Sequence, residues 1–98
     1  MTGLETALAQ LQGLREAELQ AWIAEGWVRP EQRGGRLLFQ EIDIARCRLI
    51  LELREELEVN EAAMPVVLRL LDQLHATRRQ LRRLAEALDA SRSVPDER

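Results

Sequence analysis

The segment from Leu14 to Glu25 carries side chains suited to recognising a charged partner. It contains three carboxylates, at Glu16, Glu18 and Glu25, and one guanidinium, at Arg15, so its net charge is −2. Binding to nucleic acid requires cations close to the phosphates, and this segment would instead be repelled by them. A basic protein surface is the complementary target. Three further carboxylates could extend the acidic face: Glu31, Glu41 and Asp43.

Two tryptophans could supply the apolar contact that such charges cannot. Charge pairs mainly speed and orient an encounter, whereas affinity comes from buried aromatic anchors. Trp22 has core spacing with Leu19 and Ile23, which favours a place inside the protein. Trp27 follows the helix stop at Gly26 and is therefore the better candidate for an anchor offered to a partner.

The pattern predicts neither catalysis nor a bound cofactor or metal. His75 has no Cys, Asp or Glu arrangement with metal-ligand spacing around it, so we expect it to be solvated. Cys47 is the only cysteine, lies on an apolar side of its helix and has no histidine nearby to activate it. A single cysteine also excludes an internal disulfide and a cysteine-clustered zinc site. We expect a protein that is not an enzyme.

Composition fits one small helical domain. The chain has 98 residues, of which 46% are apolar, 32% charged and 3% aromatic, so leucine must do most of the packing. The net charge of −3 draws the chain to no polyanion. Polar residues interrupt the leucines near the start of the chain, so the continuous apolar stretch of a secretory signal peptide is not found there. No apolar run approaches the roughly 20 residues of a membrane span. We expect a cytoplasmic protein.

The elements that position these residues can be read from the spacing. Apolar residues indicate a first helix from Leu4 to Gly13 and a second from about Arg15 to Glu25. A turn and hairpin occupy Val28 to Phe39, with Gly34-Gly35 at the tip. Helix, stop, Gly-Gly turn, strand and helix are the layout of a winged helix-turn-helix, so the predicted fold is all-α with a small β-hairpin wing.

A third helix is predicted from about Glu41 to Leu57, with two apolar stripes. The first is formed by Ile42, Ala45, Leu49, Leu53 and Leu57, and the second begins with Ile44, Cys47 and Leu51. A helix that is apolar on two sides should be covered on two sides. We expect the winged module to cover one stripe and the last long segment to cover the other.

That last segment is predicted to be a long helix that pairs with a second copy. Asn60 is a good N-cap, and Pro65 should distort the first turn or delay it. Apolar residues then follow a heptad pattern for three repeats, which predicts a coiled coil and a homodimer. The predicted dimerisation residues are Val67, Leu70, Leu74, Leu81, Leu84 and Leu88, with Thr77 in the same series.

These elements divide the chain into a winged module at 1–57, a dimerisation helix at 58–90 and a flexible tail at 91–98. The long helix also carries a basic cluster: Arg78, Arg79, Arg82 and Arg83. An acidic or nucleic-acid partner for this cluster is conceivable, but we interpret it as the outer face of a coiled coil.

Several strings resemble a known family. The order of elements is similar to the MerR-type winged helix, although that family has an Arg-Tyr-Tyr cluster where this chain has Gln20-Ala-Trp. A closer resemblance is to the chaperone-modulator CbpM family, across residues 14 to 88. It rests on Glu25-Gly-Trp-Val-Arg-Pro, Leu38-Phe, Leu53-Arg-Glu-Glu-Leu-Glu-Val-Asn-Glu-Ala and Val67-Leu-Arg-Leu-Leu-Asp-Gln-Leu. Many family members have glycine in place of Ala63.

The resemblance implies a concrete function. CbpM proteins are small homodimers that bind the J-domain of the DnaJ-like co-chaperone CbpA and inhibit its stimulation of the chaperone DnaK. A basic helix of the J-domain, beside a His-Pro-Asp loop, is then the expected target of the acidic residues and Trp27. The implied partners are a J-domain co-chaperone and a second copy of the chain, with no nucleic acid, membrane, small-molecule substrate or cofactor.

Two other functions stay open at this point. A MerR-type DNA-binding transcriptional regulator is the main alternative, and Arg29, Arg33 and Arg36 around the wing favour it. An assembly module that uses only its coiled coil is the third possibility.

Overall fold

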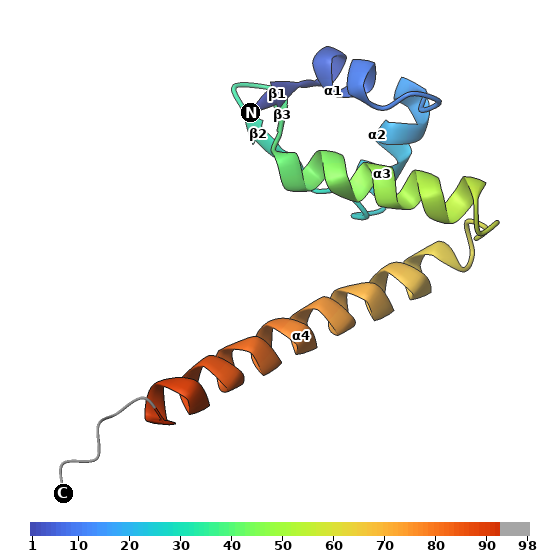
Figure 1. The fold of residues 1–98 in the computed structure, drawn as a ribbon. Coiled ribbons are helices and arrows are strands. Elements are labelled where there is room, and N and C mark those ends of the chain that lie inside the picture. Colours follow the sequence, from blue (N-terminus) through green and yellow to red (C-terminus); the bar gives the residue numbers. More distant parts are fainter. Residues whose placement is uncertain (93–98) are drawn as a thin grey trace, which may run out of the picture. The chain divides into compact units, whose positions relative to one another are not determined.

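In the computed structural model, residues 1–92 are described, and they divide into two compact units, Met1–Pro65 and the remainder from Val66 (Figure 1). The tail predicted at 91–98 lies outside the described residues from position 93 onward, while Ser91 and Arg92 belong to the last helix. Among the described residues, no helix is both long and apolar enough to cross a lipid bilayer.

The N-terminal unit is a small winged helix-turn-helix, which confirms the predicted fold class. The unit consists of three helices and a three-stranded antiparallel sheet, which lies at one end of the helices in Figure 1, and α3 lies across from α1 and α2. The elements, in chain order, are β1 (Thr2–Gly3), α1 (Leu4–Gln10), α2 (Glu16–Ala24), β2 (Glu31–Arg33), β3 (Arg36–Phe39) and α3 (Glu41–Glu55).

The wing forms as predicted around Gly34-Gly35. Both glycines have positive φ angles, 55° and 77°, which a two-residue hairpin turn requires and which only glycine adopts without strain. Arg33 pairs with Arg36 in the register that this turn sets. The sheet also contains β1, whose two residues pair with the end of β3 in the order β1-β3-β2. This short strand was not predicted, because two residues carry no periodicity.

Helix α3 buries one face, which corrects the prediction of two apolar stripes. The residues buried along it are Ile44, Cys47, Ile50 and Leu53. Of these residues, Leu53 was predicted in the first stripe, and Ile44 and Cys47 were predicted in the second. Ile50 was predicted in neither stripe. Ile42 is 72% exposed and Ala45 is also exposed, so the first stripe as predicted does not exist as a buried surface.

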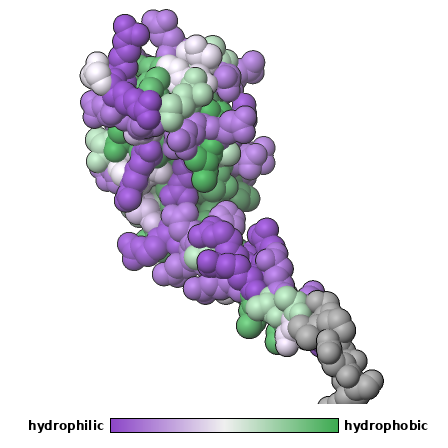
Figure 2. Space-filling model, turned by 90° about the vertical axis from the view of Figure 1, so that its left-hand side faces the viewer, coloured by the Kyte–Doolittle hydropathy of each residue, from purple (hydrophilic) through white to green (hydrophobic). Residues whose placement is uncertain are grey.

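The core of the N-terminal unit lies between this face of α3, the two preceding helices and the sheet. Its fully buried side chains include Leu11, Leu19, Val28, Phe39 and Ile50. The side of the unit that carries the sheet shows hydrophobic residues exposed among hydrophilic ones (Figure 2). Since Phe39 is the only aromatic residue besides the two tryptophans, leucine, isoleucine and valine supply most of the packing, as the composition indicates.

The last helix, α4, spans Met64–Arg92. The side-chain carbonyl of Asn60 accepts a hydrogen bond from the backbone N–H of Ala63 at 2.8 Å, which confirms its capping role. The helix proper begins only at Met64, so Pro65 lies in the first turn, where a missing N–H is tolerated. At about 1.5 Å per residue, its 29 residues extend for about 44 Å.

Five of the six predicted dimerisation residues form one stripe of exposed apolar side chains along α4, and Val67 is half-buried. Their exposed fractions are 59% for Leu70, 43% for Leu74, 60% for Leu81, 57% for Leu84 and 55% for Leu88. At Thr77, which interrupts the leucines, the hydroxyl donates to the carbonyl of Gln73 at 2.9 Å, so its polar atom is satisfied within the helix. Pairing of this stripe across a homodimer remains a prediction.

Candidate functional site

The end of α2 brings the two tryptophans together. Gly26 has a φ of 78°, and its N–H donates to the carbonyl of Ile23 while the N–H of Trp27 donates to the carbonyl of Trp22 at 2.9 Å. This pair of bonds is the Schellman helix stop, in which the residue after the glycine contacts the last turn of the helix. The Trp22 and Trp27 ring centroids therefore lie 6.5 Å apart with their planes tilted by 34°.

We expect Gly26→Ala to destabilise the protein by about 1 to 2 kcal/mol, because alanine in the left-handed conformation carries a steric penalty of that size. A Cβ at Gly26 would meet only the Arg29 side chain, at 3.8 Å, so the loss comes from the backbone and not from crowding. Gly3→Ala is the matched control, since Gly3 has a φ of −73° and open space around it. Urea unfolding checks the difference, and equal midpoints for the two variants would contradict it.

Trp27 is held in place but not fully covered. The Nε of Arg46, on α3, donates to the Trp27 carbonyl at 2.9 Å. Val28, the next residue, is buried to 1% exposure. The Trp27 ring is half-buried, while Trp22 is buried at 6% exposure. As predicted, Trp22 is a core residue and Trp27 is the more accessible of the two.

An ion pair between α2 and α3 forms one wall of the site. Arg54 Nη1 donates to Glu18 Oε2 at 2.5 Å, and the guanidinium lies 5.7 Å from the centre of the Trp22 ring. Glu18 also accepts from the Arg15 N–H at 3.1 Å, which caps the start of α2. The same guanidinium contacts Glu55 at 3.0 Å. Glu18 therefore stabilises the fold, and its negative charge is paired with Arg54 of the same chain.

These hydrogen bonds make the protein sensitive to acid at Glu18. The backbone hydrogen bond from Arg15, with Arg54 adding to it, lowers the pKa of the Glu18 carboxyl below its ordinary 4.5. A lowered pKa in the folded state gives stability that is present above the unfolded pKa and lost as pH falls through the folded one. We expect Glu18→Gln to lose part of its stability at neutral pH and to show a smaller further loss below pH 4.5 than the wild type. Chemical denaturation at several pH values measures this, and an equal loss of stability on acidification in the variant and the wild type would contradict it.

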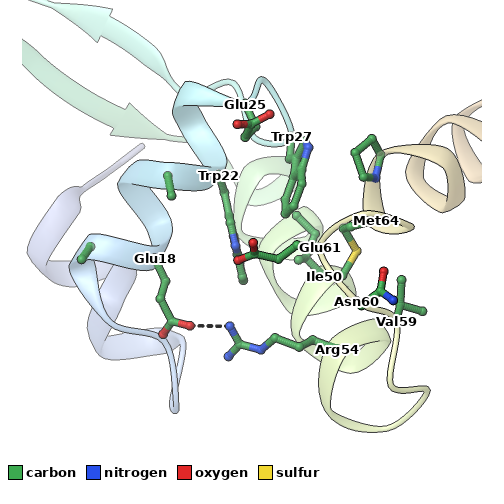
Figure 3. Close-up of a pocket in the computed structure, with 13 residues that line it drawn as sticks. Glu18, Trp22, Glu25, Trp27, Ile50, Arg54, Val59, Asn60, Glu61 and Met64 are labelled. Carbon is green, nitrogen blue, oxygen red and sulfur yellow. Dashed lines mark hydrogen bonds and ion pairs between the residues drawn. The ribbon is translucent and has the colours of Figure 1, made fainter.

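A pocket opens between α2 and the segment that leads into α4, with a volume of about 540 Å³. Figure 3 shows Glu18 joined to Arg54 at one end, Glu25 at the opposite end and the two indole rings in between. The lining is mainly apolar. It consists of Ala17, Glu18, Ala21, Trp22, Glu25, Trp27, Ile50, Arg54, Val59, Asn60, Glu61, Met64 and Pro65.

The electrostatics of this unit are strongly negative. Residues 1–65 hold seven arginines and twelve Asp or Glu residues, a net charge of −5, while residues 66–98 hold seven arginines and five carboxylates, a net charge of +2. Helix α2, the second helix of the helix-turn-helix, contains neither arginine nor lysine. Its exposed positions include Glu16, Gln20 and three alanines. Arg15, which caps the helix, pairs its guanidinium with Glu18 at 3.3 Å, so the α2 surface offers few cations for phosphate contacts.

Three of the predicted partner-binding residues meet at the pocket, and four lie elsewhere. Glu18, Glu25 and Trp27 line it. Glu16 is exposed in the first turn of α2, and Glu41 is exposed in the first turn of α3.

The other two predicted carboxylates have local partners. Glu31 pairs with Arg33 at 2.7 Å, on the β2 strand itself. Asp43 accepts from the Gln40 N–H at 2.8 Å and so caps α3.

Sequence reasoning missed several residues of the pocket. Ile50, Arg54, Glu61 and Met64 line it and were assigned to no site, and Trp22, which also lines it, was assigned to the core. One signal was available: two tryptophans five positions apart, with glycine before the second, fit the apolar contact of a Schellman stop. The Glu18–Arg54 pair joins residues 36 positions apart and has no local signature.

The cysteine and the metal-binding potential of the chain can be placed relative to the pocket. Cys47 is buried outside it, and burial raises the pKa of its thiol to about 11, so the thiol is protonated at neutral pH. Among residues 1–92, no group of three or more His, Cys, Asp or Glu side chains is placed to hold a metal ion. The pocket combines an aromatic and aliphatic floor with carboxylates at its rim.

The comparison with known proteins agrees with this architecture. Residues 5–86 match the family described as MerR HTH family regulatory protein. No curated protein and no solved structure matches the chain. The matched range includes the helix-turn-helix, the wing and most of α4. The chain belongs to the MerR helix-turn-helix family of regulatory proteins.

Proposed function

We propose that this protein is a chaperone modulator, which binds the J-domain of a DnaJ-like co-chaperone of the CbpA type and inhibits its stimulation of DnaK. The observation that carries the proposal is charge: the winged unit has a net charge of −5, and its α2 helix has no cation. The resemblance to the CbpM family across residues 14 to 88 supplies the class of partner.

The alternative target of a helix-turn-helix is duplex DNA, and α2 is poorly equipped for it. Base recognition in the major groove relies mainly on arginine, lysine, asparagine or glutamine side chains, and of these α2 offers only Gln20. Glu16 and Glu25 would face phosphates with carboxylates. Such a surface repels a polyanion and attracts a basic helix.

Inhibition would follow from occupancy. A modulator bound over the basic helix of a J-domain covers the surface through which the J-domain engages DnaK. Its carboxylates would orient the encounter, and Trp27 would supply the apolar anchor. No chemical step is required, which fits a family of regulatory proteins. A homodimer formed through α4 would carry two such surfaces, one on each winged unit.

Reversing charge on the exposed carboxylates tests the proposal. Glu16 and Glu25 are the suitable positions, because both are exposed, whereas replacing Glu18 would break its pair with Arg54. We expect Glu16→Lys/Glu25→Lys to weaken binding to a CbpA-type J-domain by about tenfold at low salt, chiefly through slower association. The residual affinity should depend less on ionic strength than that of the wild type.

The matched control changes the same number of charges away from α2. Glu52→Lys/Glu86→Lys alters one exposed residue on α3 and one on α4. We expect this control to bind within about threefold of the wild type, because neither Glu52 nor Glu86 belongs to α2 or lines the pocket. Calorimetric titration at two salt concentrations measures all three proteins. Equal affinity of the α2 variant and the wild type would place the contact elsewhere.

A transcriptional regulator is the second candidate, and two observations favour it. The chain belongs to a helix-turn-helix family, and Arg29 and Arg36 near the wing are exposed. Arg33 contributes less, because its guanidinium pairs with Glu31. A gel shift against the promoter next to its own gene tests this reading. Tight binding that weakens steeply with salt would support DNA regulation.

A further inference from the structure

We propose that the pocket beside Trp27 receives a basic side chain, arginine or lysine, from a helix of the partner protein. This inference rests on the proposed function and goes beyond it, because it assigns one chemical occupant to one pocket. The occupant is a cationic side chain whose methylene stem lies on the apolar floor and whose charged end reaches the acidic rim. Long basic side chains bury their stems and expose their heads in this way.

The floor of the pocket suits the stem of such a side chain. Trp22, Trp27, Ile50 and Met64 line it with aromatic and aliphatic surface. A guanidinium already lies against one of these rings, since Arg54 is 5.7 Å from the centre of Trp22. A second cation over the half-buried Trp27 ring would gain the same cation–π attraction.

The rim supplies the opposite charge. Three carboxylates line the pocket, at Glu18, Glu25 and Glu61, against the single guanidinium of Arg54, which gives a net charge of −2. Glu18 is already paired with Arg54. The side chains of Glu25 and Glu61 are exposed and have no hydrogen-bond or ion-pair partner among residues 1–92. Two unpaired carboxylates beside an aromatic floor therefore favour a cation over an anion or a neutral group.

The volume fits one long side chain with an apolar neighbour. At about 540 Å³, the pocket lies within the range of small-molecule sites and exceeds what a single side chain fills. A helix that presents arginine or lysine with leucine or valine one turn away would fill both the rim and the floor. That pattern describes one face of a basic amphipathic helix.

The protein provides its own reporter for this pocket. The chain contains two tryptophans, Trp22 and Trp27, and both line the pocket. Tryptophan emission therefore reports directly on occupancy. We propose to titrate the full chain with a tryptophan-free CbpA-type J-domain and to record both tryptophan emission and calorimetric heat. The test variant is Glu25→Gln/Glu61→Gln, and the control is Glu52→Gln/Glu86→Gln, with folding of each verified by circular dichroism.

The supporting result is specific. Wild type and control should bind with a change in tryptophan emission, and the test variant should bind at least tenfold more weakly with the emission change reduced. Calorimetric binding with no emission change and no effect of the test variant would overturn the pocket inference and leave the proposed function standing. A change in emission on concentrating the protein alone would assign the pocket to a second copy and also overturn the inference.

Failure of the proposed function gives a different pattern. If the J-domain produces no heat, the proposed partner is wrong, and a synthetic amphipathic helix of arginine and leucine replaces it as the probe. An emission change that the Glu25→Gln/Glu61→Gln variant abolishes would still support a site for basic side chains. No change with this peptide would overturn the inference as well.

Discussion

Replacing Trp27 with alanine is expected to weaken J-domain binding by about thirtyfold or more, which corresponds to the roughly 2 kcal/mol that defines an interface hot spot. Trp27 is half-buried beside exposed carboxylates, so it can lose its remaining exposure on binding. Its backbone is fixed by Arg46 and by the bond to Trp22, so little ordering is required when a partner docks. Calorimetric titration measures the change.

Trp27→Phe separates recognition from folding. Phenylalanine keeps an aromatic face and most of the apolar contact, so we expect this variant to recover most of the affinity. Thermal unfolding of both variants shows how much of the alanine effect is structural, because removing a half-buried ring also destabilises the unit. Wild-type affinity in a folded Trp27→Ala protein would remove Trp27 from the interface.

Placing charges on the apolar stripe of α4 is expected to abolish the predicted homodimer. Leu74→Glu/Leu81→Glu puts four carboxylates into the interface of a two-fold dimer and removes four leucines. Each buried leucine contributes about 1.5 to 3 kcal/mol, so self-association should weaken on the order of a thousandfold or more. Sedimentation velocity should show a monomer at concentrations where the wild type is a dimer.

The matched control leaves the stripe intact. His75→Glu/Arg82→Gln alters net charge by the same amount at outer heptad positions, where both residues are exposed. We expect this protein to stay dimeric. A wild type that sediments as a monomer at high micromolar concentration would contradict the predicted pairing. Loss of function in the leucine variant alone, with the Trp27 and α2 variants unaffected, would favour an assembly module.

The element boundaries could be predicted where a local signal determines them. Gly26 ends α2, Gly34-Gly35 forms the hairpin turn, and Asn60 caps the approach to α4, all as expected. Each signal acts through backbone geometry within a few residues. The end of α3 had no such signal, since Glu58 adopts a φ of 55° that no rule assigns to glutamate. The helix was predicted to reach Leu57 and ends at Glu55.

Tertiary features could not be predicted with the same success. The apolar residues of α3 are dense enough to define more than one stripe, and packing against the sheet and helices selects the face through Cys47 and Ile50. The sequence also predicted that the acidic residues of α2, β2 and the start of α3 form one acidic surface. Two of them serve as local caps, because Glu18 and Asp43 accept backbone N–H groups at the starts of α2 and α3.

Only some of the residues that line the pocket could therefore be predicted from the sequence. Trp27 was identified from its position after the helix stop and Glu25 from the acidity of its segment, and both line the pocket. Glu61 and Met64 join them only because the chain returns to α2 after α3, which requires the three-dimensional path. The net charge of the winged unit, in contrast, can be predicted from the sequence, because it depends on composition alone.

The most direct measurement is a paired titration at physiological ionic strength. The protein is titrated in parallel with a CbpA-type J-domain and with duplex DNA from the promoter beside its own gene. We expect J-domain binding at tens of micromolar or tighter and no comparable affinity for the duplex. Tight binding to the duplex, with no response to the J-domain, would show that the acidic winged unit does not recognise a basic protein.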